Sequence, residues 1–384
     1  MFNTTFEPSI TGALLSCTIA HLIGLPAIAF IPPSAIKSRY AVLFLAFIPL
    51  TLSILQLDKT TSLGQYSKMY VLGVMLNAHD FLCLMRLSAP PGSWWSKWFW
   101  AMGSSFSSRR SLPPATTENN KFILGAATKW RVMAYHALKL GISIWMRDFF
   151  TGTGLYTCVR PLFEYFRPLG TNANIGESFL LNFPSYTPLD DLFRIYFIIT
   201  ILVPPYFLFT AVHSTAALLA VSLHLSDPSR WTTPLFGDIR EAYSVRRWYS
   251  HFWHKLLRKS FTHNSAWIAQ KVLRMRSGTC QYRIVMLFLV FALSGLLHTA
   301  ALATNGGDCN DWMQMWYHFA IAVVMVLEDL VARVWCEGLS YLGVRRGWWI
   351  VRGEVLFGYV WLVLWFLEVM PLVFLPNIFC KAQV

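Results

Sequence analysis

Long apolar segments limit the fold of this chain more than any other feature of its sequence. Of its 384 residues, 55% are hydrophobic and only 13% are charged, whereas soluble domains carry about a quarter charged residues. A helix of about 20 apolar residues crosses a bilayer. About eight segments have that character, namely residues 10–31, 40–57, 66–85, 129–146, 192–223, 283–303, 312–334 and 350–375. The sequence therefore predicts an all-α polytopic membrane protein with about eight transmembrane helices, within a range of seven to nine.

Two of these segments differ from a simple crossing helix. Residues 192–223 are too many for one straight crossing and include Pro204-Pro205, so we expect a kink or a re-entrant bend there. Residues 129–146 are interrupted by Arg131 and Lys139. This segment could lie in the interface instead of crossing.

Basic residues are unevenly distributed between the loops. Most of the 32 Lys and Arg residues fall in alternate loops, at 32–39, 86–131, 224–283 and 335–352. The positive-inside rule places these loops in the cytosol and both termini on the other side. Because the net charge of +13 lies between apolar segments, it favours a membrane surface and an anionic cosubstrate over nucleic acid.

A polar, Pro-containing stretch around residues 103–120 indicates a flexible join. We therefore expect N-terminal transmembrane helices over 1–103 and a polar linker over 104–128. The remaining residues, 129–384, are expected to form a core with its motifs at 231–261 and 283–303.

One ionisable side chain lies deep in an apolar segment. His298 is the only such residue after Arg283 in the segment 283–303, and it lies roughly 22 Å along the helix. A titratable group at that depth is costly and marks a candidate functional site. Ser294 is one turn earlier, and Gly295 leaves room beside it. A buried neutral imidazole suits a general base acting on a hydroxyl, although a structural histidine hydrogen-bonded between helices is the alternative.

The stretch 231–261 is neither apolar enough to span a membrane nor polar enough for an ordinary loop. From Val245 onward its apolar residues, Trp253 among them, follow a helical stripe. This predicts an interfacial or re-entrant amphipathic helix before the segment that carries His298. The opposite face carries four basic or titratable side chains, Arg247, His251, His254 and Arg258. That face could lie on anionic lipid, or it could hold an anionic cosubstrate such as acyl-CoA.

Metal and nucleotide motifs are not evident. His251 and His254 have H-x-x-H spacing, but nothing nearby supplies an obvious third ligand, so we expect no metal. The seven cysteines include no C-x-x-C pair. P-loop, GxGxxG and GxSxG motifs do not occur.

Two motifs together resemble a known family. The stretches 234–258, P-L-F-G-D-I-R-E-A-Y-S-V-R-R-W-Y-S-H-F-W-H-K-L-L-R, and 291–298, F-A-L-S-G-L-L-H, resemble the wax-synthase-like branch of the membrane-bound O-acyltransferases. The stretch 147–156, R-D-F-F-T-G-T-G-L-Y, is similar to a segment of the fungal members, as is the late acidic pair Glu328-Asp329. Asp329 also lies four residues before Arg333, the spacing of a helical ion pair.

The resemblance implies transfer of an acyl group from acyl-CoA to a hydroxyl, in a tunnel that crosses the endoplasmic reticulum membrane. Fungal relatives acetylate terpenoid or meroterpenoid alcohols in secondary metabolism, which implies acetyl-CoA as cosubstrate and a hydrophobic alcohol as acceptor. The family's buried histidine corresponds to His298. A second polar position, often Asn in the wider family, corresponds to His254. No bound cofactor and no metal is implied.

Five further side chains are expected to bind substrate: Arg247, His251, Trp253, Arg258 and Ser294. Three other functions stay open. They are a wax-ester or sterol-ester synthase that uses long-chain acyl-CoA, a membrane terpene cyclase, and a lipid transporter without enzymatic activity. A cyclase needs an acidic initiator in the membrane, and a transporter is typically built from two similar halves; the sequence shows little sign of either.

Overall fold

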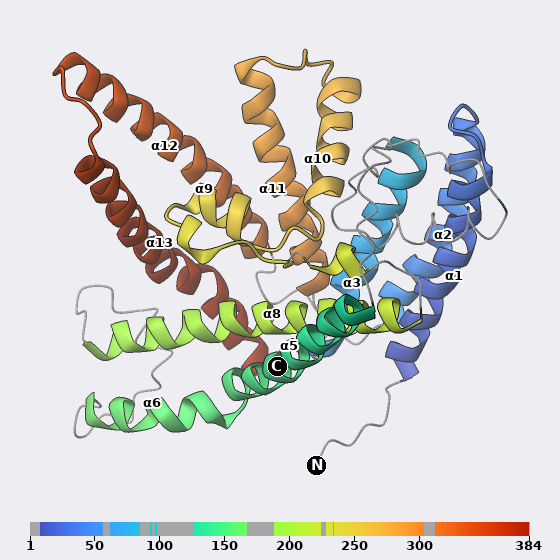
Figure 1. Ribbon diagram of the computed structural model, residues 1–384, viewed down its shortest axis with the longest axis horizontal. Helices are drawn as coiled ribbons and strands as arrows, with labels where there is room; N and C mark the ends of the chain where they lie inside the picture. The colour runs from blue at the N-terminus through green and yellow to red at the C-terminus, as the bar shows by residue number, and fades with distance from the viewer. Residues whose placement is uncertain are drawn as a thin grey trace. The chain divides into compact units, whose positions relative to one another are not determined.

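The computed structural model describes residues 8–56, 62–84, 93, 97, 126–166, 188–223, 228–232, 234–302 and 312–383. Regular structure in these ranges is entirely helical (Figure 1), which confirms the all-α prediction. The long helices are α1 (Pro8–Phe30), α2 (Ile36–Gln56), α3 (Ser62–His79), α5 (Ala126–Thr151), α6 (Thr153–Phe166), α8 (Pro188–Ser222), α10 (Arg258–Trp267), α11 (Cys280–Leu302), α12 (Met313–Tyr341) and α13 (Trp348–Gln383). Short helical turns lie between them: η1 (Asp80–Leu84), η2 (Pro228–Trp231), η3 (Ile239–Glu241), α9 (Val245–Arg247), η4 (Trp248–Phe252) and η5 (Ile268–Val272).

Four helices in the described ranges are long and apolar enough to cross a membrane. Their apolar stretches are Ile36–Ile54, Asp191–Ser222, Cys280–Ala301 and Trp348–Phe374. These coincide with the second, fifth, sixth and eighth of the predicted segments. The other four predicted segments are also helical, in α1, α3, α5 and α12. The structure therefore supports a membrane protein, and the full number of crossings stays a prediction.

Helix α8 contains both prolines of this segment. Pro204 and Pro205 lie inside one continuous helix, so the chain does not turn back there, and the alternative of a kink stays a prediction. The apolar stretch has 32 residues, or about 48 Å at about 1.5 Å per residue. A hydrocarbon core of about 30 Å accommodates such a helix through tilt.

The described chain divides into two compact units. Unit 1 contains Met1–Ala115 and Lys255–Leu327, and unit 2 contains Thr116–His254 and Glu328–Val384. The boundary passes between His254 and Lys255, and again inside α12. The predicted linker at 104–128 lies almost wholly outside the described residues, so the proposed division at that linker stays a prediction.

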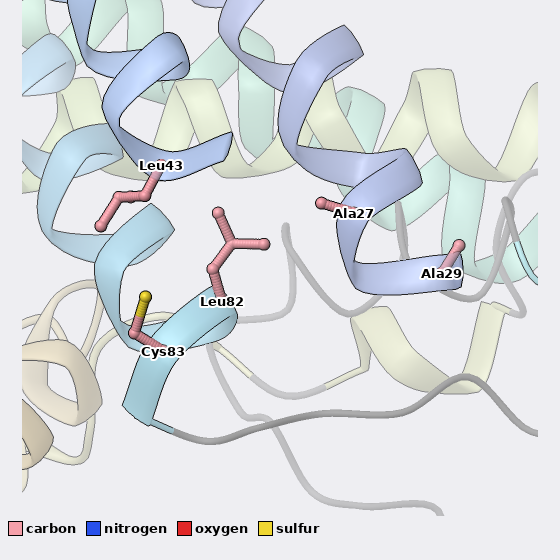
Figure 2. Packing of buried hydrophobic residues seen from close by; sticks show 5 residues of the cluster. All are labelled: Ala27, Ala29, Leu43, Leu82 and Cys83. Atoms are coloured by element: carbon pink, nitrogen blue, oxygen red, sulfur yellow. The ribbon is translucent and has the colours of Figure 1, made fainter. Parts of the chain in front are cut away.

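Unit 1 has its first core where α1, α2 and η1 meet. Ala27, Ala29, Leu43, Leu82 and Cys83 form this cluster and are all buried, and Figure 2 shows Ala27 pointing toward Leu82. The small alanines allow close packing. Arg39 is fully buried beside this cluster and donates to the carbonyls of Ile31 (2.6 Å) and Leu82 (3.2 Å). Its guanidinium thereby fixes the start of α2 against the ends of α1 and η1.

Unit 2 is organised around the long helix α8. Helix α5 packs along it, and α6 and α13 contact it as well. His136 of α5 donates from Nε2 to the carbonyl of Trp231 (3.0 Å), and its Nδ1 lies 3.3 Å from Ser214 Oγ of α8. Arg194 of α8 pairs with Glu368 of α13 at 2.6 Å. Ring contacts of Tyr206 with Phe236 (4.4 Å) and of Phe209 with His254 (4.7 Å) place α8 beside the segment 234–254, which carries the first motif.

Candidate active site

The first motif is fixed by backbone contacts at its beginning. Gly237 donates its N–H to the carbonyl of Phe252 at 2.8 Å. A Cβ at position 237 would collide with the carbonyl oxygen of His251. Only glycine, which has no Cβ, allows the backbone at position 237 to lie this close to the backbone of His251 and Phe252. Asp238 then caps η3, because its Oδ1 accepts from the N–H of Arg240 at 2.9 Å.

A pair of acidic residues holds the middle of the motif. The Glu328 carboxylate accepts from the backbone N–H groups of Val245 (2.8 Å) and Arg246 (2.9 Å). It also accepts from Trp361 Nε1 at 3.0 Å. Asp329 pairs with the Arg246 side chain at 2.7 Å. The ion pair of Asp329 is therefore made with Arg246 and not, as the spacing suggested, with Arg333.

The predicted single amphipathic helix over 245–257 was wrong. Helix α9 and the wider turn η4 end at Phe252, and Trp253 is extended with φ −60° and ψ 153°. The Phe252 carbonyl accepts from the N–H of Gly237 at 2.8 Å, so it has a partner outside the helix at the point where the helical hydrogen bonds stop. Helix α10 begins afresh at Arg258. His254 consequently lies in the extended link and not one helical turn from His251.

His254 is surrounded by aromatic rings of unit 2. Its ring lies 4.7 Å from Phe209 of α8, 5.4 Å from Trp253 and 5.9 Å from Phe236, measured between centroids. The residue is partly exposed, but its Nδ1 atom is buried and has no hydrogen-bond partner among the described residues. Burial lowers the pKa of His254 to about 4. The ring is therefore neutral near pH 7, with one N–H donor and one lone pair.

The other predicted binding residues of the first motif have varied surroundings. Arg247 donates from Nε to the Glu241 carbonyl at 2.8 Å, and its guanidinium covers the ring of Tyr243 at 4.4 Å. His251 is exposed, and its Nδ1 lies 2.7 Å from Ser250 Oγ. Trp253 stacks on Trp248 with centroids 5.7 Å apart, inside the aromatic cluster. These three belong to unit 2, whereas Arg258 begins α10 in unit 1 and is exposed.

His298 lies in α11 of unit 1, as predicted, and it stacks on a second histidine. The ring of His318, from α12, is 4.8 Å away at an interplanar angle of 28°. His318 is buried, and its Nδ1 lies 2.7 Å from the carbonyl of Gln314. Ser294 is partly buried one turn before His298. The sequence analysis did not select His318. The signal in the sequence that could have identified His318 is its position near the start of the next apolar segment, 312–334.

Sequence reasoning also missed a polar network in unit 1. His79 Nδ1 lies 2.6 Å from Asn264 Oδ1, and Asp80 pairs with His263 at 2.8 Å. Ser260 donates to Asn77. These bonds fix the end of α3 and η1 against α10, which leads into α11. The signal in the sequence was a set of three polar residues, Asn77, His79 and Asp80, at the end of an apolar segment.

A metal centre is not indicated by the described residues. They contain no group of three or more His, Cys, Asp and Glu side chains placed to hold a metal ion. His254 instead lies among aromatic rings, and His298 stacks on the ring of His318.

Part of the chain is similar to a known family. Residues 231–321 match the model of the membrane bound O-acyl transferase family. This stretch contains His254, His298 and His318, and it confirms the resemblance inferred from the two motifs. Residues 231–321 are therefore similar to this family.

Similar proteins are fungal acetyltransferases. The chain is 32% identical to acetyltransferase sirH of Emericella nidulans over 167 residues, which are 42% of this chain and 36% of that protein. It is 34% identical to acetyltransferase fsoF of Humicola fuscoatra over 160 residues, covering 40% and 37%. It is 29% identical to acetyltransferase atnC of an Arthrinium species over 161 residues, which are 42% of this chain and 36% of that protein. The chain thus spans just over a third of these relatives. No solved structure matches the chain.

Proposed function

We propose that the protein transfers an acetyl group from acetyl-CoA to the hydroxyl of a hydrophobic, terpenoid-type alcohol. One observation carries the proposal: the matched O-acyltransferase segment contains a histidine inside an apolar helix, His298, and a neutral histidine with a buried Nδ1, His254. The names of the similar acetyltransferases favour acetyl as the transferred group. We further propose that the enzyme is a multi-pass protein of the endoplasmic reticulum membrane.

The reaction needs one proton acceptor and one hydrogen-bond donor. In our proposal the acceptor alcohol enters from the bilayer, and its oxygen attacks the thioester carbonyl of acetyl-CoA. His298 takes the hydroxyl proton as the new C–O bond forms, and the C–S bond then breaks. The proton passes from His298 to the leaving thiolate, which gives free CoA and an ester. No covalent acyl-enzyme is required.

His254 is assigned the second role. A neutral imidazole can donate one hydrogen bond to the carbonyl oxygen, where negative charge develops. The low pKa of His254 suits this role, because a ring that stays neutral keeps one N–H for the oxyanion and one lone pair for another partner. A neutral amide can provide the same hydrogen bond, which accords with the Asn found at this position in the wider family.

We propose that the CoA phosphates bind basic residues near the motif. Arg258 is exposed at the start of α10. Arg247 is held by Glu241 and Tyr243, so its contribution would be to shape the loop rather than to pair directly with phosphate. Ser294, Trp253 and His251 remain proposed substrate contacts.

The test is acyl transfer by the purified protein in lipid nanodiscs. Acetyl-CoA or palmitoyl-CoA is supplied with a panel of terpenoid, sterol and fatty alcohols, and both CoA release and ester formation are measured. Ester formation from acetyl-CoA and a terpenoid alcohol supports the proposal. A preference for palmitoyl-CoA identifies a wax-ester or sterol-ester synthase. Conversion of a substrate without any CoA ester identifies a cyclase and refutes the proposal.

A further inference from the structure

The stacked pair His298 and His318 is built into the packing of α11 against α12. Gly295 lies one turn before His298 and faces Met315 and His318 of α12. A Cβ at position 295 would lie 2.9 Å from Met315 Sδ and 3.0 Å from His318 Cβ, both tighter than ordinary contacts. Glycine at this position therefore permits the approach that brings the two imidazole rings to 4.8 Å.

The hydrogen bond of His318 fixes its tautomer. A carbonyl oxygen only accepts, so the 2.7 Å contact between Nδ1 and the Gln314 carbonyl places the proton on Nδ1. Gln314 lies four residues earlier on the same helix, and both side chains are buried. The ring of His318 is thus held in one orientation with its face toward His298.

We infer that His318 is a positioning residue for His298, which it orients by stacking and whose protonated form it stabilises through its aromatic face. This inference rests on the proposed function, because His298 becomes cationic only when it takes the proton of the acceptor. Cationic charge inside an apolar helix is costly, and an aromatic face stabilises a cation that lies over it. A neutral His318 provides that face without adding like charge.

The size of the effect follows from this geometry. A cation over an aromatic ring gains an amount that corresponds to a rate factor of about 3- to 30-fold when the charge is present only in the transition state. The effect should appear in kcat and not in the KM for acetyl-CoA, because a general base gains its charge only as it takes the proton, after the substrates have bound.

The experiment compares three replacements of His318 by steady-state acetyl transfer in nanodiscs. His318→Phe keeps an aromatic face and removes both ring nitrogens. His318→Leu removes the aromatic face, and His318→Gln keeps a polar side chain without one. We expect the Phe variant to retain kcat within about 3-fold, and the Leu and Gln variants to lose about 3- to 30-fold with little change in KM. Trp316→Ala, at an exposed position on the same helix, is the matched control.

Each other outcome contradicts the inference in a distinct way. If the Gln variant is active and a folded Phe variant is not, His318 acts through a nitrogen and not through its face. If all three variants match the wild type while His298→Ala is inactive, the inference falls and the proposed function stands. If the wild type transfers no acyl group to any alcohol, both fall together. Tryptophan fluorescence against denaturant shows whether each variant is folded.

Discussion

The adjacent carboxylates of Glu328 and Asp329 allow a controlled test of how the first motif is held. Glu328→Gln and Asp329→Asn each remove one negative charge from neighbouring positions, but the two side chains make different contacts. Oε1 of Glu328 accepts from Val245 N–H and Trp361 Nε1, and Oε2 accepts from Arg246 N–H. Asp329 makes a half-exposed ion pair with the Arg246 side chain.

The expected magnitudes differ because of these contacts. A glutamine at 328 keeps two of the three hydrogen bonds if its oxygen takes the Oε1 position. Its NH₂ group then faces the Arg246 N–H, which loses a charge-assisted bond worth about 1.5–3 kcal/mol. Asparagine at 329 loses a surface-type ion pair, worth about 0.2–1 kcal/mol. We therefore expect Glu328→Gln to be more destabilising by about 0.5–3 kcal/mol, and to lower turnover more, since this motif leads to His254.

Unfolding of both variants would be followed by tryptophan fluorescence against denaturant in nanodiscs, with acetyl transfer measured in parallel. The wild-type protein and the two variants would be compared at one pH and salt concentration. Equal destabilisation by the two changes would refute the reasoning, because it would show that charge number and not hydrogen-bond geometry holds the motif.

Two other outcomes are expected. Lowering the pH from about 7.5 to about 5 should destabilise the wild type more than His254→Asn, by about 2 kcal/mol. The reason is that the unfolded imidazole gains a proton near its ordinary pKa of 6.5, whereas burial holds the folded pKa near 4, so the stability is lost as pH falls between these values. If denaturant titrations show that the wild type and His254→Asn lose the same free energy of unfolding between the two pH values, this prediction is contradicted. Asp80→Asn should cost about 1–3 kcal/mol, because it disturbs the 2.8 Å hydrogen bond between the fully buried Asp80 and His263. A cost below about 0.5 kcal/mol in the same titration would show that the pair adds nothing to stability.

The helical class and the position of His298 were accessible from the sequence, because both depend on local patterns. A run of apolar residues is sufficient to predict α11, and a lone ionisable residue in that run is visible by inspection. The end of the helix at Phe252 was not accessible. The stripe of apolar residues that begins at Val245 continues through Leu257. The helix nevertheless ends at Phe252, where the carbonyl accepts from Gly237, 15 residues earlier in the chain.

Long-range partners were the other part that the sequence could not provide. Asp80 and His263 are 183 residues apart, and no local pattern relates them. The same holds for Glu328, which caps a helix start 83 residues earlier. The spacing of Asp329 and Arg333 suggested a pair within one helix, but tertiary packing placed Arg246 closer. Such contacts follow from how helices pack, which periodicity alone does not determine.

The central claim is that His298 accepts the proton of an alcohol during acetyl transfer. The most direct test is ester formation from acetyl-CoA in a comparison of wild type, His298→Ala and Leu296→Ala. Leu296 is half-exposed two residues away on α11, so its replacement controls for changes to the helix. We predict that Leu296→Ala retains wild-type turnover, and that a folded His298→Ala loses about 10²- to 10⁴-fold. A folded His298→Ala protein that forms ester at the wild-type rate would contradict the account.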